Sequence, residues 1–347
     1  MPRRGRSERV TLADVARLAG VSTTTASKVL NGRGDVGAST RERVLAVMAE
    51  LGYRPTTARH ERSRDRSIIT VLDFVESRYA GTVLQGILVA ATAAKAELLL
   101  RLPPDEPVRT SRAAARAWME ERKASGVVGM IALAAAVPDP VLLAAEDLEV
   151  PVVAIDPIDT TESRVVSIGS TNWAGGRSAT EHLIKLGHRR IAWIGGPLGS
   201  APSVERFHGY QAALDSAGIT PDRALVRHEA FSFEAGFRHA LDLLSLDDRP
   251  TGIVAGNDEI ALGVLAAAGR LGIAVPRELS VTGFDDTPQT EWTTPRLTSV
   301  RQPLAGMGRM AVETVLAMAD GVQPASRHLQ LATTLSVRDS TGPAPAS

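Results

Sequence analysis

The sequence predicts an α/β protein in which a small three-helix head precedes a larger body with two parallel sheets. Three observations support this fold class. Residues 1–55 contain three short amphipathic runs separated by helix-ending residues, and a polar, arginine-rich stretch follows them. From Ser67 onward, apolar runs of strand length alternate with helical patterns. A chain of 347 residues is long enough for two or three folding units.

Local signals delimit the three helices of residues 1–55. Thr11 can cap the first helix, and Gly20 can adopt the left-handed conformation that ends it. Ser22 can cap the second helix, and Ser39 to Glu42 has the spacing of a capping box at the start of the third. The inward faces are expected to carry Leu12, Val15, Ala16, Ala19, Ala26, Val29, Leu30, Val44, Met48 and Leu51.

The first two helices have the layout of a helix-turn-helix. Ala16 is small enough to let the helices approach, Gly20 makes the turn, and Val21 fills the core between them. The residues that the second helix then presents outward are Thr23, Thr24, Ser27 and Lys28. Hydroxyls and a lysine on such a helix suit base edges and phosphates in a major groove. A plain helical hairpin is the alternative interpretation.

Charge is unevenly distributed along the chain. The whole sequence has 39 basic and 39 acidic residues, but residues 1–66 contain 14 Lys and Arg against 7 Asp and Glu. A basic head on an acidic body favours a polyanionic partner for the head alone. Residues 56–66 show no apolar pattern and are predicted to be a hinge or linker, with a disordered tether as the alternative.

Residues 67–342 are predicted to form two lobes, because their strand-like runs are too many for one sheet. Chain crossings between the lobes are expected near Gly169, Thr294 and Leu329. The first lobe then comprises about residues 67–169 and 295–328, and the second about residues 170–294 and 329–342. Ligands of such folds bind at the carboxyl ends of strands, so a site is expected in the cleft.

Three polar residues of the body follow strand-like runs or begin helical ones: Arg206, Asn257 and Asp285. A guanidinium, an amide and a carboxylate that converge on a cleft suit the alternating donors and acceptors of a polyhydroxyl ligand. Each residue also has a structural alternative, since Asn257 can cap a helix and Arg206 can form a salt bridge.

Composition and motifs argue against several other classes of protein. The chain has no Cys and its seven His show no i, i+4 pair, so no metal site and no cofactor are expected. No apolar run could cross a membrane or act as a secretory signal, which favours a cytoplasmic protein. The segment from Gly195 to Ser200 lacks the Lys of a phosphate loop, and no nucleophile motif is present, so an enzyme is not expected.

Longer motifs carry a specific resemblance. The head contains TLADVARLAGVSTTTASKVLN, STRERV and AELGYRP, and the body contains HLIKLGHRRIAWIGGP, ERFHGYQAAL, GNDEIALGVLAAAGRLGIAVPRELSVTGFDD and PRLTSVRQP. Together these motifs resemble the lactose/galactose repressor (LacI/GalR) family of bacterial transcriptional regulators, through about residue 338. The resemblance implies a body like that of periplasmic binding proteins, and a repressor whose homodimer binds a pseudo-palindromic operator.

The resemblance also implies which residues contact operator DNA. Thr23, Thr24 and Lys28 fall where the family reads bases, and Lys28 stands where Arg is usual. The hinge leucine that family members insert into the minor groove aligns with Arg62, so we expect arginines to enter a narrowed groove instead. The expected DNA contacts are Thr11, Ser22, Thr23, Thr24, Ser27, Lys28, Asn31, Thr40, Tyr53, Arg59 and Arg62.

For the body, the resemblance implies a small-molecule effector, most commonly a sugar or glycoside, that alters operator affinity. The expected effector contacts are Tyr79, Asp156, Arg206, Phe231, Asn257, Asp285 and Gln302. The terminal segment STGPAPAS lacks the apolar heptads of a tetramerising coil, which favours a homodimer. A sugar-binding protein without a DNA role, and a corepressor-dependent regulator that responds to a nucleobase, stay open as alternatives.

Overall fold

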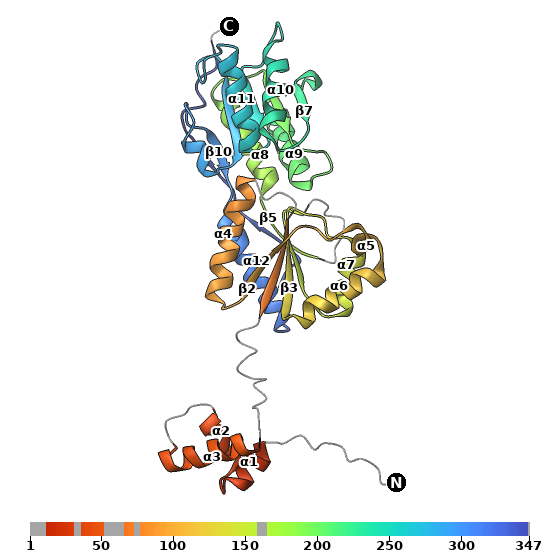
Figure 1. Ribbon diagram of the computed structural model, residues 1–347. Helices are drawn as coiled ribbons and strands as arrows, with labels where there is room; N and C mark the ends of the chain where they lie inside the picture. Colours follow the sequence, from red (N-terminus) through yellow and green to blue (C-terminus); the bar gives the residue numbers. More distant parts are fainter. Residues whose placement is uncertain (1–11, 31–35, 52–65, 73–76, 158–164, 346–347) are drawn as a thin grey trace. The chain divides into compact units, whose positions relative to one another are not determined.

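The structure is a computed structural model, and it describes residues 12–30, 36–51, 66–72, 77–157 and 165–345. The chain splits into two compact units, Met1–Arg64 and Asp65–Ser347, and each is considered by itself (Figure 1). Five of the expected DNA contacts lie outside the described residues: Thr11, Asn31, Tyr53, Arg59 and Arg62.

The smaller unit contains three helices, as predicted: α1 (Leu12–Leu18), α2 (Thr23–Leu30) and α3 (Ala38–Glu50). Their shared core consists of Val15, Ala16, Ala19, Ala26, Val29, Val44 and Met48, with Val21, Val36, Val47 and Leu51 packed at its edge. Arg43 of α3 donates a hydrogen bond of 3.0 Å from Nε to the carbonyl oxygen of Ala19, beyond the end of α1. This bond satisfies one of the carbonyl groups that a helix end leaves without a partner.

The turn between α1 and α2 has the predicted geometry. Gly20 adopts a φ of 63°, the left-handed conformation that ends a helix without steric cost. The Ser22 hydroxyl accepts a hydrogen bond of 3.1 Å from the Thr25 amide and so caps α2. Both helix signals of this segment are therefore confirmed.

The start of α3 differs from the prediction. The Arg41 amide donates to the Gly37 carbonyl at 3.0 Å, so the helix already begins at Ala38. Ser39 lies inside the first turn, and the predicted capping box from Ser39 to Glu42 is wrong. Gly37 can take the cap position without a side chain, which hides this boundary in the sequence.

Gly20→Ala is expected to lower the stability of the head by about 1–2 kcal/mol, because a Cβ atom is disfavoured in the left-handed conformation. No atom of the described residues beyond the adjoining ones would lie within 4 Å of the new Cβ, so backbone strain is the expected cause. Residue-level hydrogen exchange of the full chain measures this loss. As a control, Gly269→Ala near the end of the helix Asp258–Arg270 (α11) also has no described atom near its new Cβ, but the residue has an ordinary φ, so the change should not destabilise its unit. Equal losses in both variants would contradict the explanation.

The first of two six-stranded sheets in the larger unit is parallel throughout. Its order is β11-β5-β4-β3-β1-β2, and its strands are β1 (Ser67–Leu72), β2 (Glu97–Arg101), β3 (Val127–Leu133), β4 (Val152–Ile155), β5 (Val166–Ser170) and β11 (His328–Leu331). The pattern β2-β1-β3-β4-β5 is that of a doubly wound fold, which places ligands at the carboxyl ends of the strands.

The second sheet repeats this pattern and adds one antiparallel edge strand. Its order is β12-β10-β9-β8-β6-β7, and its strands are β6 (Ile191–Gly195), β7 (Val226–His228), β8 (Gly252–Ala255), β9 (Ser280–Asp285), β10 (Thr298–Arg301) and β12 (Thr334–Ser336). Only β12 runs antiparallel to its neighbour β10. The prediction of an α/β body with two mainly parallel sheets is confirmed.

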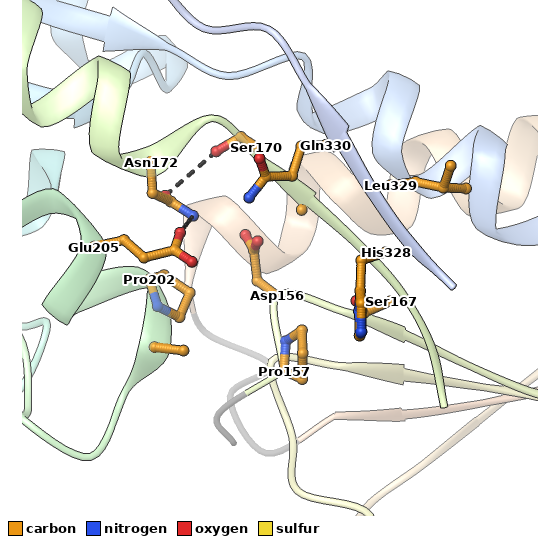
Figure 2. A pocket seen from close by; sticks show the side chains of 12 residues that line it. Asp156, Pro157, Ser167, Ser170, Asn172, Pro202, Glu205, His328, Leu329 and Gln330 are labelled. Carbon is orange, nitrogen blue, oxygen red and sulfur yellow. Dashed lines mark hydrogen bonds between the residues drawn. The ribbon is translucent and has the colours of Figure 1, made fainter. Parts of the chain in front are cut away.

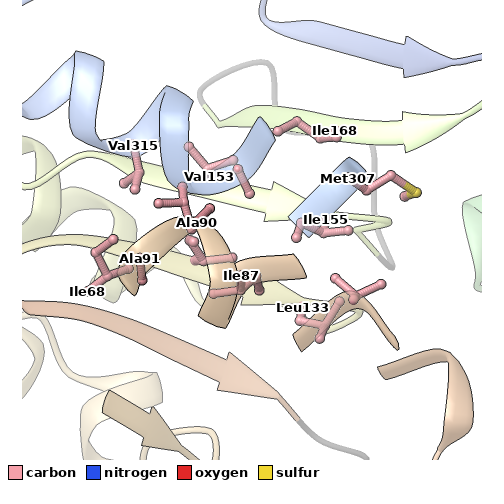
Figure 3. Packing of buried hydrophobic residues seen from close by; sticks show 14 of the residues in the cluster. Ile68, Ile87, Ala90, Ala91, Leu133, Val153, Ile155, Ile168, Met307 and Val315 are labelled. Atoms are coloured by element: carbon pink, nitrogen blue, oxygen red, sulfur yellow. The ribbon is translucent and has the colours of Figure 1, made fainter. Parts of the chain in front are cut away.

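Helices cover both faces of each sheet (Figure 1). On the first sheet, α4 (Arg78–Ala93) and α12 (Leu304–Ala319) pack on one face, and α5 (Glu106–Thr110), α6 (Arg112–Ala124) and α7 (Asp139–Asp147) on the other. On the second, α10 (Phe233–Leu244) and α11 (Asp258–Arg270) pack opposite α8 (Asn172–Lys185) and α9 (Ala201–Ser216). Figure 3 shows Ile87 and Val315, from α4 and α12, packed with strand residues of the first sheet. Among the described residues, no helix is long and apolar enough to cross a membrane.

The chain passes between the sheets three times: after β5, between β10 and α12, and between β11 and β12. The first passage lies next to the expected one near Gly169. The expected crossing near Thr294 is too early, because β10 pairs with β9 and stays in the second sheet. The crossing near Leu329 is also too early, because β11 pairs with β5 in the first. Apolar runs reveal strands but do not reveal which sheet each strand joins.

Candidate functional site

Two acidic residues stand at strand ends of the larger unit, where a doubly wound fold binds ligands. Asp156 follows β4, and Asp285 is the last residue of β9. Their φ angles are 44° and 110°, in the range that favours glycine. Such strained backbone persists where the surrounding structure fixes it, often at functional sites. Both carboxyl groups are nearly inaccessible to solvent.

Arg206 of α9 organises the cluster around Asp285. Its side chain is 4% exposed. Its Nε donates to Asn172 Oδ1 at 2.8 Å, and its Nη1 donates to the Gly256 carbonyl at 2.8 Å and lies 3.5 Å from Asp285 Oδ1. The guanidinium also stacks over the Phe284 ring, 3.8 Å from its centroid. Of its donors, Nη2 makes no hydrogen bond to the described residues.

Two further expected residues hold the acidic side chains in place. The Gln302 amide, just after β10, donates to Asp285 Oδ1 at 2.6 Å. The Tyr79 hydroxyl, on α4, donates to Asp156 Oδ2 at 2.6 Å. Each carboxylate thus keeps one oxygen that accepts nothing from the described residues. The two acidic groups come from different sheets, so the structure brings both lobes into one polar cluster.

Burial shapes the protonation of this cluster. It raises the pKa of Asp156, an effect that the Tyr79 hydrogen bond and the Arg206 charge oppose. It raises the pKa of Asp285 to about 7, against the lowering effects of Arg206 and Gln302. The Tyr79 pKa is raised as well, first by burial and then by the Asp156 charge. Asp285 therefore exchanges its proton near neutral pH.

Asp285→Asn is expected to change how the stability of the larger unit depends on pH. Since the folded pKa of Asp285 is about 7 and its ordinary value is 3.8, the folded state holds a proton that the unfolded state lacks between these values. The contribution of Asp285 to the free energy of unfolding therefore falls as pH rises between these two values, by up to about 1.4 kcal/mol per pH unit. Urea unfolding at pH 5 to 8 should show this slope in the difference between wild type and variant. Parallel curves would contradict it.

The remaining expected residues have structural roles of their own. Asn257 Oδ1 accepts the Ile260 amide at 2.9 Å and caps α11, which leaves its Nδ2 group available. Phe231 is half-buried, with its ring 5.8 Å from the Arg206 guanidinium. It packs over Gly196, where a Cβ atom would come within 2.3 Å of the ring. The glycine-rich turn thus makes room for an aromatic ring.

A cavity of about 230 Å³ lies beside the cluster (Figure 2). Its lining includes Asp156, Ser167, Gly169, Ser170, Asn172, Ala201, Pro202, Glu205, His328, Leu329 and Gln330. Figure 2 shows Asn172 between Ser170 and Glu205, and the Asn172 amide donates to Glu205 Oε2 at 3.1 Å. Sequence reasoning missed Asn172 and Glu205. Asn172 follows the strand-like run RVVSIGS after one intervening residue, Thr171, and this position at a strand end is the signal that could have found it.

The described part of the chain contains no group of three His, Asp or Glu side chains that could hold a metal ion. In the smaller unit, Thr23 and Thr24 are exposed at the start of α2, while Lys28 and Thr40 are half-buried. The Ser22 hydroxyl is engaged in the helix cap, and the side chain of Ser27 lies outside the described set. The start of α2 is thus the described surface that fits the expected groove contact.

Comparison with known proteins agrees with both units. The model of the lacI family of bacterial regulatory proteins matches residues 11–56, and that of the periplasmic binding protein-like domain matches residues 180–341. The transcriptional regulator CelR of Thermobifida fusca is 33% identical over 96% of this chain and 99% of its own. The transcriptional regulator MalR of Streptomyces coelicolor is 33% identical over 96% of this chain and 97% of its own. The transcriptional repressor PurR of Klebsiella pneumoniae is 29% identical over 88% and 89%.

Solved structures show the same similarity. The CelR–cellobiose complex matches with a TM-score of 0.70 and 31% identity, over 96% of this chain and all of that chain. The lac repressor dimer bound to operator and the anti-inducer ONPF matches with a TM-score of 0.70 and 29% identity, over the same shares. These relatives are DNA-binding transcriptional regulators and not enzymes. With identity above 30% along nearly its whole length, the chain belongs to the LacI family of bacterial regulatory proteins.

Proposed function

We propose that this protein is a cytoplasmic repressor whose homodimer binds a pseudo-palindromic operator, with α2 of each head in a major groove. The observation that carries the proposal is the start of α2, where exposed Thr23 and Thr24 follow the Gly20 turn. The excess of positive charge in residues 1–66 supports it. Contacts from Ser27, Lys28, Thr40 and the five residues outside the described ranges belong to the same proposal.

We infer that the dimer forms through the face made by α4 and the edge strand β2. Four apolar side chains on α4, on β2 and directly after β2 are exposed: Leu88 (54%), Val89 (64%), Leu100 (47%) and Leu102 (66%). Because β2 pairs only with β1, its other edge can accept a second copy of the chain. Burial of such apolar side chains is the usual driving force of subunit association.

We propose that a small polar effector, a sugar or glycoside, binds in the cleft and bridges the two lobes. Buried hydrogen-bonding groups with unpaired atoms beside a cavity support this role, as does the cellobiose bound by a relative. The effector would favour one angle between the lobes and thereby change operator binding. A coupling of about 1–3 kcal/mol would change operator affinity by about 5- to 150-fold.

The proposal is tested by selecting bound sequences from random duplex DNA with the full chain and with a truncation that starts at Ser67. Enrichment of one pseudo-palindrome by the full chain alone is the expected result. Enrichment by neither protein contradicts a repressor that acts without a ligand. The selection is then repeated with adenine as a probe, because one relative is a PurR repressor. Enrichment only with adenine would favour the corepressor alternative.

A further inference from the structure

The balance of charge in the cleft restricts its ligand, an inference that rests on the proposed effector role. We infer that the effector is a hydroxyl-rich compound without negative charge, neutral or amine-bearing, and that Glu205 makes the cavity reject carboxylates and phosphates. Three features of the larger unit carry this inference: the ratio of acids to bases, the engagement of Arg206, and the kind of atoms left without partners.

Acidic groups outnumber basic groups in this part of the cleft. Asp156 and Glu205 line the cavity, and Asp285 lies in the adjoining cluster. Among the described residues, neither Lys nor Arg lines the cavity, and the imidazole of His328 has its Nδ1 hydrogen-bonded with the Ser167 hydroxyl at 2.8 Å. The pKa of Asp156 is raised first by burial, and the neighbouring Glu205 charge adds to this rise. An anionic ligand would therefore meet Glu205 and the ionised forms of Asp156 and Asp285, without a basic side chain among the described lining residues to offset them.

Arg206 is poorly placed to offset this excess. Its Nε and Nη1 groups are engaged by Asn172, the Gly256 carbonyl and Asp285, so Nη2 is the donor left for a ligand. A guanidinium that binds a phosphate or carboxylate tightly does so with two parallel donors. Here one nitrogen, Nη2, is left, so parallel N–H groups from two nitrogens are not available for a ligand, and Asp285 already neutralises part of the guanidinium charge.

The unpaired atoms also favour a ligand with donors. One oxygen each of Asp156 and Glu205 accepts nothing from the described residues. Gln302 Oε1 is buried and has no hydrogen-bond partner in the described part of the chain. A buried acceptor without a donor is costly, so a ligand that supplies donors gains affinity here. Hydroxyl and ammonium groups can donate to these atoms, whereas a fully ionised phosphate offers acceptors only.

The electrostatic potential of the cavity can be measured without knowing the effector, from the NMR relaxation that charged paramagnetic probes cause. Three nitroxides of similar size, one cationic, one neutral and one anionic, are added to the full chain with isotope-labelled methyl groups. The methyls of Ala201 and Leu329 line the cavity and report on it, and exposed Val322 serves as a distant reference. The cationic probe should relax the two cavity methyls at least about twice as strongly as the anionic probe, relative to Val322. Equal relaxation by both charged probes would overturn the inference.

A ligand panel then tests specificity by calorimetry and thermal shift. Glucose, galactose, mannose and cellobiose are each compared with amino, uronic acid and phosphate derivatives of the same sugar. Binding should be confined to neutral and amino members, with anionic members at least about tenfold weaker. Tight binding of a phosphate or uronate would overturn the inference. If no member binds while the cavity has a negative electrostatic potential, the sugar effector of the proposed function is contradicted. The inference that the cavity rejects anionic ligands is still supported in that case.

Glu205→Gln separates the charge of Glu205 from its shape. It keeps the side chain close in size while removing one carboxylate, so the discrimination against anionic sugars should fall by several fold. Glu146→Gln removes an exposed carboxylate from α7, outside the cavity lining, and should leave the discrimination unchanged. Equal changes in both variants would show that net charge and not the cavity determines the preference.

Discussion

Arg206→Ala is expected to lower the free energy of unfolding of the larger unit by about 3–5 kcal/mol, in addition to abolishing effector binding. Removing one partner of a buried ion pair leaves the other charge without compensation. Here Asp285, Asn172 and the Gly256 carbonyl would all lose the hydrogen bond or charge that Arg206 provides. The Phe284 ring would lose its stacking partner as well. The salt bridge that the sequence predicts as the structural alternative for Arg206 is therefore present, and it is expected to contribute to stability whether or not the residue contacts a ligand.

Urea unfolding monitored by the tryptophans measures this effect at pH 8, where Asp285 is largely ionised. Arg189→Ala, at an exposed position before β6, is the matched control and should change stability by less than about 0.5 kcal/mol. Arg206→Lys keeps the charge but not the planar donor group, so an intermediate loss is expected. If Arg206→Ala were as stable as wild type, the buried ion pair would contribute nothing to the fold.

Val89→Glu is expected to weaken operator binding by about 10²- to 10⁴-fold without touching the head. Val89 is 64% exposed on α4 and belongs to the proposed dimer face. A carboxylate buried in an apolar interface is costly, so the dimer should dissociate. A monomer then binds half-sites one at a time and loses the effective concentration that the second head gains from the first.

Analytical ultracentrifugation and operator titration, carried out on the same samples, measure the two linked effects. Val322→Glu introduces the same charge at a residue of the same type that is 60% exposed beyond α12, and should leave both unchanged. If Val89→Glu remains a dimer, the dimer interface lies on another face of the protein. Normal operator affinity in a proven monomer would contradict the two-headed mode of binding.

Much of the fold could be predicted because local physics determines it. The left-handed Gly20 and the Ser22 cap are decided by residues within one turn, and both are found where the sequence indicated. The errors concern features that depend on contacts between distant segments or on a residue without a side-chain signal. The residues of β10 form an apolar run like those of the other strands, and its pairing with β9 is what places it in the second sheet. The start of α3 at Ala38 depends on Gly37, a cap with no side-chain signal.

The candidate site divides in the same way. Asp285 could be placed because it ends a strand-like run, whereas Asp156, Tyr79 and Gln302 are expected only from the family resemblance. The structure brings these four residues into one polar cluster with Arg206. Asn172 and Glu205 could not be ranked, since an Asn at a helix start and a Glu in a helix are both common. What distinguishes them is the cavity that they line, which forms only when segments far apart in sequence meet.

The three passages of the chain between the sheets have a consequence for synthesis on the ribosome. Helix α12 supplies Leu304, Met307, Ala311, Val312 and Val315 to the core of the first sheet, and β11 closes one edge of that sheet. Both segments are translated only after the strands of the second sheet up to β10. The first lobe therefore stays incomplete until nearly the whole chain has emerged. Until then, part of its apolar face is uncovered and the edge of β5 is unpaired. During that interval the growing polypeptide needs protection from aggregation, as by a nascent-chain chaperone, more than the finished protein does.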